Sequence, residues 1–295
     1  MNLTIQQSRE LCIMHYYDNL IVGSSGYVGS RLFHRLPSEK NYLVTSKSHF
    51  AQFLKLAESL EFKNVFWVAG SQLPADTFEY KLEEHPDLVN LEKLIRKLQK
   101  SEACFIFLSS GGCVYGPGSG VFTEASNTFP VNLYGELKLL SEQMIANNLN
   151  NYTILRVANV FGMGQKPSRS QGVIPHWLEA IRKNRPLTVF GSTHSYRDYI
   201  DIDSVINAIL LSSKSSTKGV FNIGSGTKIE LAKLIDIFEH VLGRSLSILS
   251  LDARTSDRDG YLLDSKKAEA NLGWRKPQDI LKLLEGVILQ ELNAN

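Results

Sequence analysis

The sequence lacks the features that mark secreted, membrane-spanning and nucleic-acid-binding proteins. Its three cysteines show no paired or metal-type spacing, and an odd count favours reduced thiols over a disulfide framework. No apolar run approaches the ~18 residues that a membrane span requires. A formal net charge of +2 gives no electrostatic reason to bind a polyanion, so we expect no nucleic-acid partner. These absences favour a cytoplasmic protein that works in solution.

Targeting signals, metal-ligand spacings and repeats are missing from the sequence as well. Residues 1–19 contain no apolar stretch of the kind found in signal peptides, and we expect them to form an N-terminal extension. The seven histidines lack the spacing of metal ligands, so we interpret them as surface or satisfied core residues. The length allows roughly two domains of ~150 residues, or one large unit with an appended lobe.

Apolar strands alternate with helices through the first half of the chain. The predicted strands are 20–22, 42–45, 65–70, 104–108 and 152–157, and the predicted helices are 27–36, 50–60, 82–98 and 131–149. This alternation is typical of an α/β fold with a doubly wound, mainly parallel Rossmann sheet, which binds ligands at the carboxyl ends of its strands.

The pattern becomes irregular after residue 165. The later predicted elements are helices at 174–183 and 230–242 and strands at 187–190 and 220–223. We therefore expect a dinucleotide-binding domain over 20–165 and a smaller, mixed α/β substrate lobe over 166–295. Parts of 198–225 are expected to return to the first domain.

A glycine-rich turn follows the first predicted strand. The pattern Gly23-x-x-Gly26-x-x-Gly29 is a spacing variant of the turn that lets a pyrophosphate approach the backbone at a helix N-terminus. The glycines alone are better explained by a plain strand-to-helix turn, whereas the downstream residues described next favour a dinucleotide site. The candidate cofactor-binding residues are Gly23, Ser25, Gly26, Tyr27, Val28, Gly29, Ser46, Lys47, Ala69, Gly70, Tyr134 and Lys138.

A tyrosine and a lysine lie one turn apart on the predicted helix 131–149. Tyr134 and Lys138 share a face because residues four apart are neighbours on a helix. A free phenol titrates near pH ~10, and a nearby ammonium favours its phenolate. Tyr134 could therefore exchange a proton with a substrate alcohol while a nicotinamide cofactor takes the hydride from the same carbon.

The second predicted strand ends without a carboxylate. An acid at this place normally binds the ribose hydroxyls of NAD, but the sequence here is Thr45-Ser46-Lys47-Ser48. A lysine with hydroxyls could instead accept the 2′-phosphate of NADP. A solvated loop explains the same residues equally well.

Taken together, these motifs resemble the NAD-dependent epimerase/dehydratase family of extended short-chain dehydrogenase/reductases, which act on nucleotide-linked sugars. The other motifs that carry the resemblance are Ser109-Ser-Gly-Gly-Cys-Val-Tyr-Gly116, Leu155-Arg-Val-Ala-Asn-Val-Phe-Gly162, Arg197-Asp-Tyr-Ile200, Phe221-Asn-Ile-Gly-Ser-Gly226 and Leu272-Gly-Trp274. The resemblance covers nearly the whole chain after residue 19. It implies NAD as the default cofactor, with NADP possible, and a nucleotide-diphosphate sugar as substrate.

The resemblance also assigns roles to residues of the second half. Asn159 and Arg197 would contact the sugar and diphosphate, and Arg254 matches a second diphosphate arginine. Val173 and Phe190 would line the base pocket. Among the acids that surround Arg197, strand alternation would split the directions of the carboxylates, so Arg197 is the better functional candidate. A homodimer is expected because the counterparts of helices 82–98 and 131–149, both striped with leucine, form a four-helix interface in similar proteins.

Two departures from the family pattern bear on structure and chemistry. Only about eighteen residues separate the second strand from Val65, which is too few for the usual helix, edge strand and return, so one edge strand should be missing. The family's helper hydroxyl falls on Gly111. Ser110 or Ser109 would have to bind the substrate oxygen in its place, and both are therefore candidate catalytic residues with Tyr134 and Lys138.

Three functions fit these residues. A nucleotide-sugar 4-epimerase, which we favour at this point, would use a retained cofactor to form a 4-keto sugar and return hydride to its other face. The alternative is an NADPH-dependent nucleotide-sugar ketoreductase, for which Lys47 and the missing carboxylate argue. The third is a non-catalytic cofactor- or sugar-binding protein, suggested by Gly111. Dehydration is not expected, because the acid and base positions of the family's 4,6-dehydratases hold Gly112 and Cys113.

Overall fold

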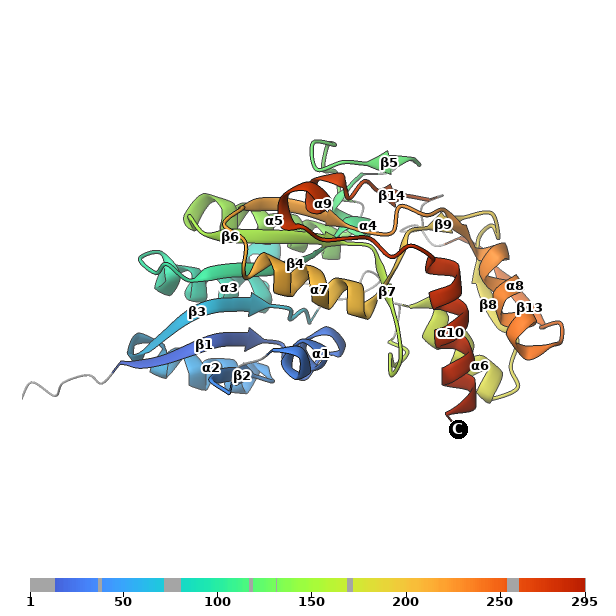
Figure 1. Ribbon diagram of the computed structural model, residues 1–295, viewed down its shortest axis with the longest axis horizontal. Coiled ribbons are helices and arrows are strands. Elements are labelled where there is room, and N and C mark those ends of the chain that lie inside the picture. The colour runs from blue at the N-terminus through green and yellow to red at the C-terminus, as the bar shows by residue number, and fades with distance from the viewer. Residues whose placement is uncertain are drawn as a thin grey trace, which may run out of the picture.

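A six-stranded parallel sheet forms the centre of the molecule (Figure 1). The computed structural model describes residues 14–36, 39–71, 81–116, 119–130, 132–168, 172–253 and 260–294. Within them the strand order is β11-β6-β4-β3-β1-β2. The strands are β1 His15–Val22, β2 Asn41–Val44, β3 Leu60–Trp67, β4 Cys104–Ser110, β6 Tyr152–Val157 and β11 Gly219–Ile223. This sheet confirms the predicted Rossmann-type α/β fold.

Helices cover both faces of the sheet, which explains why its central strands are apolar without alternation. Adjacent strand residues point to opposite faces, so Leu20 and Val65 pack in one buried cluster while Ile21 and Phe66 pack in another. The first cluster includes side chains of α2 Lys47–Leu56, α3 Pro86–Leu98 and α5 Leu133–Asn148. The second includes those of α1 Tyr27–Arg35, α7 Ile202–Ser212 and α9 Lys266–Leu272.

The sheet ends at β2, as predicted from the short distance between the second and third strands. β2 pairs with β1, and α2 with a 3₁₀ turn at Ala57–Ser59 leads directly to β3. The expected absence of one edge strand is thereby confirmed for the described residues. At the opposite edge, β11 pairs with β6 although it lies far along the chain.

The remaining C-terminal elements form a smaller lobe beside the carboxyl ends of the strands (Figure 1). Its own buried cluster joins α6 Val173–Arg182, α8 Leu231–Leu242 and α10 Ile280–Asn293. A two-stranded sheet pairs β8 Leu187–Phe190 with β13 Ile248–Leu251.

The remaining short elements are spread along the chain. They are η2 Leu82–Glu84, α4 Gly111–Val114, β5 Val121–Phe122, β7 Asn159–Phe161, β9 Tyr196–Arg197, β10 Tyr199–Asp201, β12 Ile229–Glu230 and β14 Leu262–Leu263.

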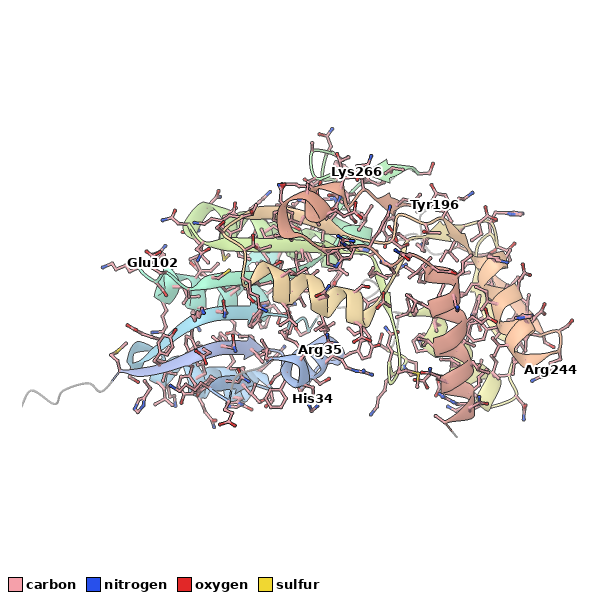
Figure 2. The ribbon with its side chains drawn as sticks, viewed as in Figure 1. His34, Arg35, Glu102, Tyr196, Arg244 and Lys266 are labelled. Carbon is pink, nitrogen blue, oxygen red and sulfur yellow. The ribbon has the colours of Figure 1, made fainter. Side chains whose placement is uncertain are left out.

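The two leucine stripes behind the dimer expectation differ in burial. On α3, Leu91 and Leu94 are at most 1% exposed and pack between the helix and the sheet. On α5, Leu137 is buried, whereas Leu133, Leu140 and Met144 are only half-buried. The α3 stripe therefore serves the core of one subunit, and the homodimer stays a prediction. Charged side chains such as Glu102 and Arg244 project from the surface (Figure 2). Among the described residues, no helix is both long and apolar enough to cross a membrane.

Candidate active site

A cavity of about 1460 Å³ opens at the carboxyl ends of the sheet strands, between the sheet and the C-terminal lobe. This is where ligands bind in doubly wound α/β folds. Its wall contains every candidate site residue predicted from the sequence except two. Gly29 is buried and does not line the cavity, and Arg254 falls outside the described residues.

The glycine turn after β1 leaves room for a ligand at the start of α1. Gly23 has a φ of +94°, and a Cβ there would lie 2.7 Å from the backbone of Ala69. A Cβ on Gly29 would lie 2.0 Å from the carbonyl oxygen of Gly23, so the helix must begin close to the turn. The N-cap residue Gly26 provides no side-chain cap for the first amides of α1. This backbone cradle fits the pyrophosphate of a dinucleotide.

Hydroxyl and basic groups form the wall that follows β2. Ser46 caps α2 by accepting a hydrogen bond from the backbone N–H of His49 at 3.1 Å, and Lys47 occupies the first helical position. The Ser25 hydroxyl donates to the carbonyl oxygen of Thr45 at 2.8 Å and so joins this wall to the glycine turn. The first turn of α2 contains no acidic residue. The wall therefore offers positive charge and a helix N-terminus where NAD-specific sites place a carboxylate.

Tyr134 and Lys138 lie together on α5, where the sequence predicted them. The Asn132 side chain caps the helix by accepting from the N–H of Gly135 at 2.8 Å. Lys138 is 8% exposed, its Nζ donates to the carbonyl oxygen of Leu108 at 2.8 Å, and Nζ lies 5.7 Å from the centre of the Tyr134 ring.

The buried position of Lys138 controls its charge. Burial lowers the pKa of Lys138 to about 8, and the carboxylates of Asp87 and Glu142 oppose that change. At neutral pH the lysine therefore remains largely an ammonium, which stabilises negative charge on the neighbouring phenol. This is the electrostatic arrangement that an acid/base tyrosine requires.

The two serines at the end of β4 have different surroundings. The Ser109 hydroxyl donates to Oε1 of Glu142, whose other oxygen pairs with Arg156 at 2.6 Å, and all three side chains are buried. Ser110 is half-buried on the cavity wall. We infer that Ser110, and not Ser109, is the hydroxyl available to a substrate oxygen.

Gly111 faces protein rather than the cavity. A Cβ on Gly111 would lie 2.6 Å from Cδ1 of Leu263, a residue of β14, and Gly111 is absent from the described wall of the cavity. A hydroxyl-bearing side chain at position 111 would thus displace Leu263. Gly111 thus makes room for Leu263 at the position where the resemblance to the family would place a helper hydroxyl.

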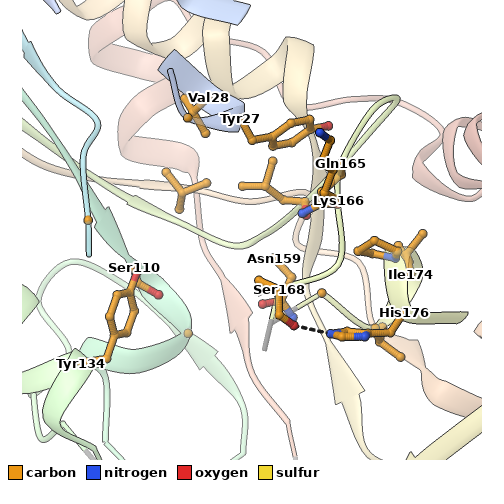
Figure 3. Close-up of a pocket in the computed structure, with 18 of the residues that line it drawn as sticks. Tyr27, Val28, Ser110, Tyr134, Asn159, Gln165, Lys166, Ser168, Ile174 and His176 are labelled. Carbon is orange, nitrogen blue, oxygen red and sulfur yellow. Dashed lines mark hydrogen bonds between the residues drawn. The ribbon is translucent and has the colours of Figure 1, made fainter. Parts of the chain in front are cut away.

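The opposite wall comes from β7, α6 and the segment between them, and much of it was not predicted. Asn159 lies there as expected, and its Oδ1 accepts from the Tyr261 hydroxyl at 3.3 Å. Gln165, Lys166, Ser168 and His176 join it on this wall, where no sequence motif had marked them (Figure 3). His176 is half-buried and hydrogen-bonded, which agrees with the interpretation of the histidines as surface or satisfied core residues, but its place on the cavity wall was not predicted.

The acids around Arg197 point in different directions, as strand alternation predicted. Asp198 is buried and accepts from the backbone N–H of Ser225 and of Leu263, whereas Asp201 caps α7 and Asp203 faces Arg35 at the surface. Arg197 itself lines the cavity. These carboxylates therefore do not form a catalytic cluster.

Comparison with known proteins identifies the family. The model of the NAD dependent epimerase/dehydratase family matches residues 19–224. The chain belongs to this family. The resemblance seen in its motifs is thereby confirmed.

The names of individual relatives refer to different reactions. A dTDP-4-dehydro-6-deoxyglucose reductase of Escherichia coli is 40% identical over 175 residues, which are 58% of this chain and 55% of that protein. A putative UDP-glucose 4-epimerase of Methanocaldococcus jannaschii is 28% identical over 306 residues, covering 94% of this chain and 99% of the relative. The reductase match thus spans only about half of that relative, whereas the epimerase match spans nearly the whole length.

Solved structures of the family share the fold. The UDP-glucose 4-epimerase of Thermotoga maritima, solved with UDP-glucose, superposes with a TM-score of 0.82 at 23% identity and covers 94% of this chain and 100% of its own. The UDP-glucuronic acid 4-epimerase of Bacillus cereus, solved with UDP-glucuronic acid and NAD, gives a TM-score of 0.82 at 19% identity with the same coverage.

Proposed function

We propose that the protein is an NADPH-dependent 4-ketoreductase of a nucleotide-diphosphate sugar, with Tyr134 as its acid. The observation that carries this proposal is the wall at the start of α2, where Ser46 and Lys47 stand in place of a carboxylate. A reductase must release its oxidised cofactor after every turnover and bind a reduced one. A site suited to the 2′-phosphate therefore favours reduction over epimerisation, and the reductase named among the relatives points the same way.

The residues around the reacting carbon each have a distinct task in this scheme. When bound, the nicotinamide supplies the hydride that reaches C4 of the sugar. Tyr134 gives its phenolic proton to the C4 oxygen, so that the ketone becomes an alcohol. The Lys138 ammonium stabilises the phenolate left behind, and Ser110 donates a hydrogen bond to the same oxygen.

The other wall holds the rest of the substrate. The Arg197 guanidinium would pair with the diphosphate, and the Asn159 amide would hydrogen-bond a sugar hydroxyl. Val173 and Phe190 lie at the lobe end of the cavity, where an apolar surface suits a flat base. The substrates named for relatives are a dTDP-linked keto sugar and UDP-linked sugars, which motivates these nucleotide sugars as probes.

The stoichiometry of cofactor use tests the proposal. We expect the purified protein to oxidise one NADPH for each dTDP-4-dehydro-6-deoxyglucose consumed, and to use NADH at least about tenfold less efficiently. Substrate conversion without net NADPH oxidation would contradict the proposal.

A 4-epimerase is the second candidate, because the putative UDP-glucose 4-epimerase matches nearly the whole chain. It would use Tyr134 and Lys138 in the same way but keep its cofactor bound. Denaturing the purified protein and identifying any released cofactor separates the two. Tightly held NAD, together with interconversion of UDP-glucose and UDP-galactose, would establish the epimerase. The third option, a non-catalytic binder, loses its basis because Ser110 offers the cavity a hydroxyl that Gly111 does not.

A further inference from the structure

The segment of residues 162–168 carries part of the substrate wall but has no regular secondary structure. It joins β7 to the stretch before α6, and it contributes Gln165, Lys166 and Ser168 to the cavity (Figure 3). A chain segment outside helices and strands is positioned by its individual contacts. The contacts of this segment therefore decide where those three side chains lie.

Residues of three helices hold the 162–168 segment. Arg31 of α1 donates through Nη2 to the carbonyl oxygen of Met163 at 2.6 Å. The backbone N–H of Gly164 donates to Oε1 of Glu291 at 2.6 Å. Nε2 of His176, on α6, lies 2.5 Å from the carbonyl oxygen of Ser168. The segment is thus tied to α1, α10 and α6 in turn.

Glu291 connects two of these supports. Its Oε2 pairs with Nη2 of Arg182 at 2.8 Å, and the same Nη2 donates to the carbonyl oxygen of Glu291 at 2.6 Å. Arg182 ends α6 and Glu291 lies in the last turn of α10, and neither is part of the described wall of the cavity. One carboxylate therefore joins the C-terminal helix, the helix that carries His176, and the substrate segment.

An ordinary surface ion pair would contribute little, because solvent screens it. The Glu291 side chain, however, is 12% exposed and accepts a backbone N–H with one oxygen while the other meets the guanidinium. Burial alone would raise the pKa of Glu291, but the Gly164 N–H and Arg182 outweigh it and hold that pKa below its ordinary value. The carboxylate is charged and doubly satisfied at neutral pH.

We propose that Glu291 and Arg182 are positioning residues that fix the 162–168 segment and thereby set the affinity for the nucleotide-sugar substrate. This inference rests on the proposed function, because it takes that wall to bind a nucleotide sugar. The pair acts from outside the cavity. Its loss should weaken substrate binding while leaving the chemistry at Tyr134 intact.

Hydrogen exchange in the ligand-free protein tests the clamp without any reaction. In Glu291→Ala, amides of residues 162–168 should exchange about tenfold faster than in the wild type, while those of β4 and α5 stay unchanged. Glu285→Gln is the matched control, since Glu285 lies on the same helix, is half exposed and pairs with His240 at 3.4 Å, away from the 162–168 segment. Unchanged exchange in residues 162–168 would overturn the proposal, whatever the enzyme catalyses.

Kinetics with dTDP-4-dehydro-6-deoxyglucose provide the second test. Glu291→Ala and Arg182→Ala should each raise KM about tenfold with kcat within about twofold of the wild type, and KM for NADPH should not move. Because the two side chains act as one unit, the double variant should be no worse than either single one. Additive losses, or a fall in kcat alone, would contradict the proposal.

Two further controls separate the possible failures. If Glu291→Ala does not fold, Glu291→Gln retains the volume and removes the charge, and it should show a smaller change in the same direction. If the wild type turns over no nucleotide sugar, the proposed function fails while the exchange experiment still decides the clamp.

Discussion

Tyr134 and Lys138 show how one buried charge shapes the chemistry of its neighbour. Lys138 gives a single hydrogen bond to backbone, at the carbonyl oxygen of Leu108, and its ammonium lies over the Tyr134 ring. The sequence predicted this pair from its spacing together with the glycine turn and the hydroxyl-rich strand end that precede it. It did not predict that Ser109 would be bound to Glu142, because that contact joins residues 33 apart.

The first prediction concerns proton transfer. Tyr134→Phe should lower kcat by about 10²-fold or more, because the phenol that protonates the C4 oxygen is gone. NADPH binding, followed by fluorescence, should stay close to that of the wild type. Tyr16→Phe is the control, since Tyr16 is 51% exposed on β1, and it should leave turnover unchanged. Near-normal turnover of Tyr134→Phe would remove Tyr134 from the mechanism.

The second prediction concerns the stability cost of Lys138. The pKa of Lys138 is about 8 in the folded protein and ~10.4 in the unfolded chain, so the folded protein binds this proton less tightly. The free-energy cost of burying the charged Lys138 is full below pH ~8, and it is relieved as the pH rises toward ~10. In the cofactor-free protein, Lys138→Met should therefore raise the free energy of unfolding at pH 7 by about 1–3 kcal/mol, and by less at pH ~9.5.

Urea unfolding at the two pH values measures this effect. Lys93→Met is the control, because Lys93 is exposed on α3 and should change the free energy of unfolding little at either pH. A Lys138→Met variant that is less stable than the wild type at neutral pH, or whose gain does not depend on pH, would contradict the assigned burial penalty.

Among the elements, α2 carries the proposed preference for NADPH. Its N-terminus combines the Ser46 cap, the Lys47 side chain and a first turn without acids. Because one edge strand is missing, α2 follows β2 directly at the border of the sheet. Element order and helix polarity together place positive charge on this wall of the cavity, where we propose that the adenosine end of the cofactor binds.

The third prediction tests that wall. Lys47→Ala should weaken NADP(H) binding by about 1–3 kcal/mol, the usual range for a charge-assisted hydrogen bond, and leave NAD(H) binding nearly unchanged. Lys55→Ala changes a lysine at the other end of the same helix and should affect neither. Titration calorimetry at low salt gives both affinities. Equal losses for the two cofactors, or no loss, would show Lys47 to be a solvated loop residue.

Local pattern predicted most elements of the first half, and tertiary contacts decided the rest. Strand β6 has the predicted bounds, and every residue of it after Tyr152 is buried. Strand β1 begins five residues before the predicted start at Leu20, because His15–Asn19 pair with β3 despite their polarity. β13 was not predicted, and its pairing with β8 depends on a partner about sixty residues away. The residues proposed to bind the cofactor were predicted because contiguous motifs contain them, whereas Gln165, Lys166, Ser168 and His176 belong to no motif.

For the whole molecule, the sheet and the lobe each supply one wall of a shared cavity. The sheet side presents Tyr134, Lys138 and Ser110, and the lobe side presents Asn159 and Arg197. Sequence motifs build mainly the sheet side, whereas Gln165, Lys166, Ser168 and His176 on the other side belong to no motif. The family can therefore be read from the sequence more readily than the particular reaction.

The fourth prediction concerns assembly. We retain the homodimer as a proposal, in which α3 would use its outward face, because its leucines are buried, and α5 would use its half-buried Leu133 and Leu140. Sedimentation at micromolar concentration should then give a mass twice that of the 33.1 kDa chain. A single species at the mass of one chain would rule the dimer out.

Transfer of label from the cofactor to the sugar tests the central claim most directly. The protein is incubated with dTDP-4-dehydro-6-deoxyglucose and NADPH deuterated at the transferable position, and the product is examined by NMR. The account predicts one deuterium at C4 for each NADPH oxidised, with the incorporation rate strongly reduced in Tyr134→Phe. A product that lacks deuterium at C4, or an inverted C4 centre formed without oxidation of NADPH, would contradict it.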